Sequence, residues 1–150
     1  MDIKEFMDKD LQFIKDVVQE LSDNITTWDT DKVFEKAKEM FDLFSCRFSL
    51  EDSLLCQMTC STDVKLGIKN FLKRRREFRE RLEDILELHA DDPEFRKAIS
   101  SVLETVRKHM KYREEEFYPQ VIDRLPATDL ERMSQALKKK IDSGMVRAQA

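Results

Sequence analysis

The sequence predicts an all-α fold: an up-down-up-down four-helix bundle followed by a short additional C-terminal helix. Glycine and proline are rare, at two and three of 150 residues, whereas a sandwich or barrel needs many turns. Charged residues make up 39% of the chain and hydrophobic residues 41%, a balance typical of long amphipathic helices. Four long stretches of helical periodicity with short links indicate the bundle. The length supports one hydrophobic core, so we expect a single domain over residues 1–150.

The first helix is predicted to begin after Asp2, to use Glu5 in a capping box, and to end near Asn24. Its inner stripe is apolar at helical spacing, and consists of Met7, Leu11, Ile14, Val18 and Leu21, flanked by Phe6, Phe13 and Val17. The lone Trp28 falls in the link that follows. Asp29 or Thr30 is expected to cap the next helix.

The second helix is predicted to run to about Met58, with two charged residues inside its inner stripe. That stripe consists of Val33, Ala37, Met40, Phe44, Arg47, Glu51, Leu54 and Met58. Arg47 and Glu51 lie one turn apart on a face that is otherwise apolar, although charged side chains normally occupy the solvated face. Periodicity therefore predicts two inward-facing charges at this level.

The third helix is predicted to start at a cap on Ser61 or Thr62 and to end near His89, where a cation is favourable. Its inner stripe consists of Val64, Ile68, Phe71, Phe78, Leu82 and Ile85. A basic run at residues 73–76 is followed by interleaved arginines and carboxylates. We interpret it as a salt-bridged solvated face, since no aromatic side chains stand among the cations to stack on nucleic-acid bases.

The fourth helix is predicted to carry Pro93 in its first turn and to be kinked or ended near Pro119. Its inward residues are Phe95, Ile99, Val102, Val106, His109, Arg113 and Phe117. Thr128 and Glu131 suggest a capping box that opens a short helix from Asp129 to about Ser143, with Gly144 after its end. The tail at 145–150 is expected to fray.

Charge and hydropathy exclude several classes of partner. A net charge of −4 and a pI near 5.4 provide no general attraction to nucleic acid or anionic lipid. No apolar stretch reaches the ~18 residues of a membrane span, and the first residues lack the apolar region of a signal peptide. We expect a cytoplasmic protein with no nucleic-acid or membrane partner.

Three cysteines, Cys46, Cys56 and Cys60, form no disulfide framework, and two thiolates are too few for a closed zinc site. We expect ordinary buried thiols. The alternative is a redox-responsive pair of Cys56 and Cys60, which lie one helical turn apart.

Three stretches of the chain combine charged or polar residues with apolar ones at helical spacing: residues 10–14, 47–52 and 109–119. They resemble motifs of the hemerythrin-like, or HHE cation-binding, family. Residues 109–119 place a histidine before a carboxylate cluster and an aromatic-proline end, as in the family's last helix. Residues 47–52 (Arg-Phe-Ser-Leu-Glu-Asp) resemble the His-Phe-x-x-Glu-Glu of its second helix. Residues 10–14 (Asp-Leu-Gln-Phe-Ile) resemble the Asp-His-x-x-Ile of its first helix. The resemblance implies a four-helix bundle around a di-iron centre.

The same resemblance implies that most metal ligands have been replaced. The histidine positions of the first three helices fall on Leu11, Arg47, Val64 and Ile68, and only His109 remains. Glu51 keeps the second-helix carboxylate, and the last carboxylate position falls on Arg113 or Glu114.

These replacements suggest how the empty interior is filled. Leu11, Val64 and Ile68 can occupy space that metal ligation needs elsewhere in the family. Arg47 and Arg113 are expected to face Glu51 and Glu114, because a carboxylate in a bundle core is costly without a positive partner. Two guanidinium groups would then provide the charge balance of two iron ions. The alternative is that both arginines extend outward and pair at the surface.

The resulting expectation is a degenerate bundle that has lost its di-iron centre and acts as a binding or regulatory module. Its partner would be another protein or a second copy, and we expect no cofactor and no enzymatic activity. No Ser/His/Asp or Cys/His set and no Gly-rich phosphate loop appears. The alternative is a reduced non-heme iron site on Glu51, His109 and Glu114 that senses iron, oxygen or nitric oxide. A redox sensor that uses Cys56 and Cys60 is a third hypothesis.

Overall fold

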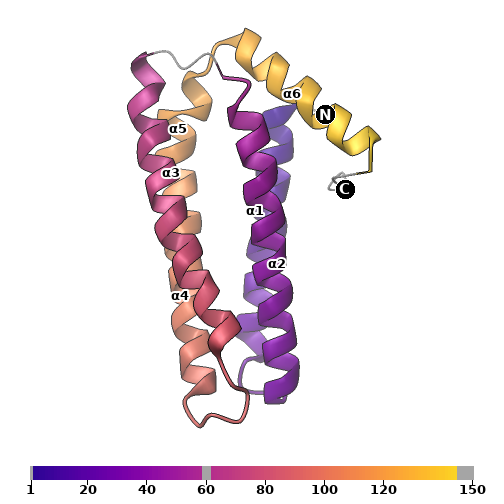
Figure 1. Cartoon of the computed structure of the whole chain (residues 1–150), viewed down its shortest axis with the longest axis vertical. Helices are drawn as coiled ribbons and strands as arrows, with labels where there is room; N and C mark the ends of the chain where they lie inside the picture. Colours follow the sequence, from indigo (N-terminus) through magenta and orange to yellow (C-terminus); the bar gives the residue numbers. More distant parts are fainter. Residues whose placement is uncertain (1, 59–61, 145–150) are drawn as a thin grey trace.

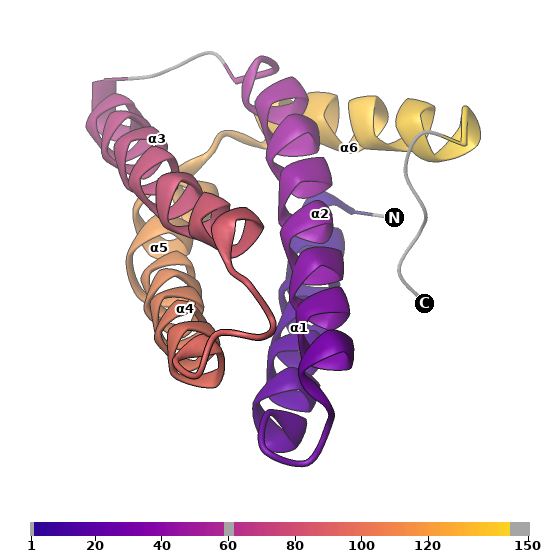
Figure 2. The ribbon, with the colours of Figure 1, turned by 60° about the horizontal axis from the view of Figure 1, so that its bottom comes forward.

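Every regular element is a helix in the computed structural model, which describes residues 2–58 and 62–144, and the all-α prediction is confirmed. Four long helices follow the long dimension of the molecule: α1 (Ile3–Asn24), α2 (Thr30–Leu55), α3 (Thr62–Glu83) and α4 (Phe95–Tyr112). A fifth long helix, α6 (Ala127–Asp142), lies across one end of them (Figures 1 and 2). No helix in the described part of the chain combines the length and apolar character of a membrane span.

A short helical turn follows α3. A 3₁₀ turn, η1 (Asp84–Glu87), extends α3, so His89 lies in the loop beyond it and the prediction of a final-turn histidine is wrong. Pro93 precedes α4 and is not part of its first turn. The carboxylate of Asp92 accepts a hydrogen bond from the Glu94 backbone N–H at 2.8 Å and holds the chain in a turn until the helix begins.

Capping residues are present at three predicted helix ends and differ from the prediction at a fourth. Asp2 accepts from the backbone N–H of Lys4 at 3.1 Å, and Asp29 accepts from that of Lys32 at 2.8 Å, so both predicted caps are confirmed. The predicted capping box at Thr128 is wrong, because α6 already begins at Ala127, directly after a proline. Gly144 follows α6 with φ of 79°, the left-handed conformation that terminates helices and favours glycine.

Pro119 produces a π turn rather than a sharp break. Beyond α4, the chain continues through the π turn η2 (Arg113–Phe117) and the short helix α5 (Tyr118–Gln120), and the 3₁₀ turn η3 (Ile122–Arg124) follows. The Tyr118 N–H bonds to the carbonyl of Arg113, five residues back. A proline has no N–H to donate, and the wider turn carries the helix past it. Arg113 and Phe117 both stay buried in this turn.

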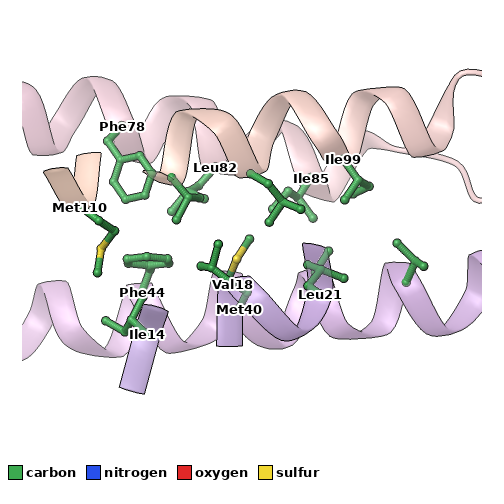
Figure 3. Close-up of a cluster of buried hydrophobic side chains, with 14 of the residues drawn as sticks. Ile14, Val18, Leu21, Met40, Phe44, Phe78, Leu82, Ile85, Ile99 and Met110 are labelled. Atoms are coloured by element: carbon green, nitrogen blue, oxygen red, sulfur yellow. The ribbon is translucent and has the colours of Figure 1, made fainter. Parts of the chain in front are cut away.

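Buried apolar side chains form two clusters along the helices. The first cluster lies among α1, α2, the C-terminal part of α3 with η1, and α4 (Figure 3), and includes Ile14, Val18, Leu21, Met40, Phe44, Phe78, Leu82, Ile85, Ile99 and Met110. The second lies toward α6 and includes Ile3, Phe6, Leu54, Val64, Phe71, Phe117, Met133 and Leu137. The predicted stripes supply most of these residues. Phe13 is an exception, at 41% exposed.

Candidate functional site

Five charged side chains interrupt the interior where the two apolar clusters meet. We call them the charged cluster: Asp10 of α1, Arg47 and Glu51 of α2, Arg75 of α3, and Arg113 of η2. Each side chain is only 10–14% exposed. Charges this deep are costly unless they are paired. Their pairing therefore determines what the site is able to do.

Arg113 holds Glu51 by a two-pronged ion pair. Its Nη1 contacts Oε2 of Glu51, and its Nη2 donates to Oε1 at 3.1 Å. The Nε–H of the same guanidinium donates to Nε2 of His109 at 2.9 Å. Burial favours the neutral form of Arg113, but the charge and hydrogen bonds of Glu51 outweigh it and raise its pKa. Arg113 is therefore a permanent cation.

His109 is held as a neutral ring. Its imidazole stacks on Phe78 with centroids 4.0 Å apart and planes 14° from parallel. Burial, reinforced by the positive charge of Arg113, lowers the pKa of His109 well below its ordinary value of 6.5. Because Nε2 accepts the hydrogen bond from Arg113, the ring proton resides on Nδ1.

Arg47 pairs with Asp10, on a different helix from Glu51. Its Nε lies 2.7 Å from Oδ1 of Asp10, without the alignment of a hydrogen bond. Burial outweighs this nearby cation and raises the pKa of Asp10 to about 6, and the negative charge of Glu51 adds to the effect. The expected pairing of Arg47 with Glu51 along α2 is therefore wrong, because the first helix supplies the partner.

Arg75 belongs to this site, although the sequence analysis places it on the solvated face of the third helix. Its guanidinium contacts Glu51 at 3.3 Å and Asp52 at the rim, and lies over the rings of Phe48 and Phe71. The interpretation of the whole basic run as a solvated face is wrong at this residue. Its spacing from the inner stripe was an available signal, since Arg75 follows Phe71 by one turn.

The structure brings together some of the predicted site residues and separates others. Leu11 borders the charged cluster. Val64 and Ile68 belong to the second apolar cluster. At the level of Glu51, α3 instead presents Phe71 and Arg75.

Glu114 does not reach the charged cluster. It is 41% exposed and pairs with Lys15 of α1 at the surface. The predicted pairing of Arg113 with Glu114 is therefore wrong, because neighbouring positions on a helix point in different directions. The alternative iron site on Glu51, His109 and Glu114 remains a hypothesis, but Glu114, one of its three proposed ligands, is held at the surface by Lys15.

A small cavity remains inside the charged cluster. Its volume is about 30 Å³, and Asp10, Arg47, Glu51, Arg113 and Tyr118 form much of its polar wall. The Tyr118 hydroxyl donates to the Met7 carbonyl at 3.2 Å, and burial raises its pKa. This volume is enough for a water molecule but far below that of a small-molecule site, about 300 Å³ or more.

The donor set does not fit a di-iron centre. Among residues 2–58 and 62–144, no three His, Cys, Asp or Glu side chains converge as a metal site. Glu51 is flanked by two guanidinium groups, and the inward lone pair of His109 accepts from one of them. The two guanidinium groups beside Glu51, with that of Arg47 in the same cluster, would repel a divalent metal ion.

The thiols differ from expectation. Cys46 and Cys56 are exposed, so the prediction of buried thiols is wrong for these two. Cys60 lies outside the described residues, as do Ser61 and the tail at 145–150.

Comparisons with protein-family models, curated proteins and solved structures return no match for this chain. The resemblance to the hemerythrin-like family therefore rests on the residues of the three motifs.

Proposed function

We propose that this protein is a degenerate hemerythrin-like four-helix bundle in which buried ion pairs replace the di-iron centre. It acts as a binding or regulatory module for another protein or a second copy. The observation that carries the proposal is the position of Arg113, whose guanidinium binds Glu51 and His109 at once. These are the two metal-donor types that the family resemblance leaves in this chain.

The spatial arrangement of the three motifs supports this proposal. Asp10 and Leu11 come from the first motif, Arg47 and Glu51 from the second, and Arg113 from the third. All five border one small cavity. Stretches that resemble a family's ligand motifs are expected to converge on one site, and unrelated surface similarities are not.

A module role also agrees with the chemistry of the interior. The polar atoms of the charged cluster are largely engaged with one another, and the cavity is too small for an organic substrate. Recognition would then use the outer surface of the helices. The iron-, oxygen- or nitric-oxide-sensing alternative requires Glu114 beside His109, whereas Glu114 pairs with Lys15 at the surface.

Metal content and absorption test the proposal directly. Protein purified without chelators should contain iron far below stoichiometric amounts and show no oxo-bridge absorption in air. Iron at about two equivalents per chain with such bands would refute the replacement of metal by guanidinium. Arg113→Ala, purified in the same way, serves as a control, since it frees both candidate donors, Glu51 and His109.

A further inference from the structure

An open groove of about 370 Å³ runs between α3 and α4, separate from the cavity of the charged cluster. Its walls carry Arg74 and Arg81 from α3 and Lys108 from α4, and His109 lines it as well. This volume lies within the range of small-ligand sites, about 300–1,000 Å³. His109 is 6% exposed and so connects the groove with the buried interior.

His109 contributes a hydrogen-bond donor to the groove. Its Nε2 is occupied by the Nε–H of Arg113, and one ring face is covered by Phe78. Because Nε2 is engaged, we infer that the protonated Nδ1 is the polar atom that His109 offers to the groove, and none of the hydrogen bonds among the described residues involves it. A nearly buried N–H of this kind takes a partner from solvent or from a ligand.

The cations that line this groove are not paired with carboxylates among the described residues. Within the described part of the chain, Arg74, Arg81 and Lys108 form no ion pair, and neither do Glu77 and Glu80, which also line the groove. The three cations outnumber the two carboxylates. An anion seated among them would therefore meet a net attraction.

The Arg74 guanidinium is also fixed in position. It lies over the ring of Tyr112, 4.6 Å from the centroid, at one edge of the same groove. Stacking fixes His109 in the same way on Phe78. Two donors that are already oriented lose little conformational freedom when a ligand binds.

We propose that the α3–α4 groove binds a small oxyanion, a carboxylate or phosphate group, through His109 Nδ1–H, Arg74 and Lys108. The groove presents N–H donors and a net positive charge, which match an oxyanion and not a metal ion. The inference goes beyond the module role and does not rest on it, because the groove geometry is independent of any family resemblance. Binding would communicate with the Glu51–Arg113 pair, since one imidazole contacts both sides.

NMR titration tests this site. Inorganic phosphate and acetate are added separately at constant ionic strength, with chloride as the exchanged anion. Imidazole ¹⁵N spectra should show a saturable shift of the His109 Nδ1 resonance with at least one of the two. Loss of a charge-assisted hydrogen bond should weaken binding about tenfold in Arg74→Met and in His109→Gln. Glutamine keeps an acceptor for Arg113 but removes the Nδ1 donor.

Arg76→Met is the matched control, because it removes the same charge from the same helix outside the groove. It should bind the anion as the wild type does. Equal weakening in Arg74→Met and Arg76→Met would indicate diffuse attraction and overturn the site. So would a shift that does not saturate with either anion. If His109→Gln fails to fold, the comparison of the two arginine variants decides alone. Saturation by only one anion supports the site and identifies its preferred oxyanion.

Discussion

The Nε–H of Arg113 donates to Nε2 of His109 across 2.9 Å, one helical turn apart. This contact occupies the Nε2 lone pair with a permanent cation, so this nitrogen is not free to bind a metal ion. The same guanidinium holds Glu51 on α2 by its other two nitrogens. Arg113 therefore shares the charge balance of Glu51 with Arg75 and also determines the tautomer of the histidine.

The Arg113–Glu51 pair should be strongly coupled. Arg113→Met leaves a buried carboxylate with only Arg75 beside it, and we expect the free energy of unfolding to fall by about 3 kcal/mol or more. Adding Glu51→Gln should recover part of that loss. Chemical denaturation of the single and double variants measures the coupling. Arg79→Met is the control, since its exposed pair with Glu83 is expected to contribute at most about 1 kcal/mol. A loss below that value in Arg113→Met would refute the buried pairing.

Arg47 should couple to Asp10 and not to Glu51. A double-mutant cycle of Arg47→Met with Asp10→Asn should give an interaction energy of about 0.5–3 kcal/mol, typical of residues in contact. The cycle of Arg47→Met with Glu51→Gln should give a smaller one, because Glu51 pairs with Arg75 and Arg113. Denaturation curves at pH 7 provide both values. A larger coupling to Glu51 would favour pairing along α2 over pairing between helices.

Asp10 should give stability an unusual pH dependence. Its pKa in the fold, about 6, lies above the ordinary 3.8, so the folded protein binds this proton more tightly than the unfolded chain does. This contribution is fully present below pH 4 and is lost as pH rises through 6. It amounts to about 3 kcal/mol. The free energy of unfolding of the wild type should therefore fall, relative to that of Asp10→Asn, as the pH rises from 4 to 6.

The difference between these two proteins is the required measurement, because His109 acts in the opposite direction. Its lowered pKa makes the fold less stable as pH falls below 6.5, and both proteins retain it. Subtracting the two stability curves removes the histidine contribution. A flat difference from pH 4 to 7 would show that Asp10 titrates normally.

Two thiols should react readily in the folded protein. Cys46 and Cys56 are exposed, so a thiol reagent at neutral pH should label both at rates close to those of the unfolded chain. Mass spectrometry of quenched samples identifies the labelled positions, and Cys46→Ser and Cys56→Ser remove them one at a time. Slow labelling of either residue would mean that another part of the chain or another molecule covers it.

Histidines placed at the level of Glu51 should create a metal site. The variant replaces Leu11, Arg47, Phe71 and Arg75 by histidine and Arg113 by glutamate. It introduces several nitrogen and oxygen donors around His109. We expect a folded holoprotein with a divalent metal and a poorly stable apoprotein, since buried imidazoles without metal lack partners. Calorimetric titration with zinc and elemental analysis measure the binding.

The matched control for this variant moves only the third-helix pair. It places histidines at Val64 and Ile68, the positions that the family resemblance implies, and keeps Phe71 and Arg75. Val64 and Ile68 pack in the second apolar cluster, away from Glu51, so this version should bind metal more weakly. Tighter binding by the control would show that the motif alignment describes the site better than the contacts of α3 do.

The sequence by itself determined the helices and the inward direction of several charges. Periodicity of 3.6 residues places Arg47, Glu51, His109 and Arg113 on the same stripes as buried Phe44 and Val106, and the structure keeps all four largely inside. Asp2 and Asp29 cap their helices as predicted, because a capping bond involves only residues within one turn. These features depend on local spacing, which a sequence displays directly.

Only the tertiary structure decided which charges meet. Arg47 pairs with Asp10, and Arg75 joins Glu51, because both contacts depend on how far one helix is shifted and rotated against another. A single-helix pattern carries neither quantity. The placement of Phe71 and Arg75 rather than Val64 and Ile68 beside Glu51 has the same origin. Phe71 and Arg75 follow Val64 and Ile68 by two turns, about 10.5 Å, and such a shift along α3 leaves its inner stripe unchanged and exchanges every partner that it contacts.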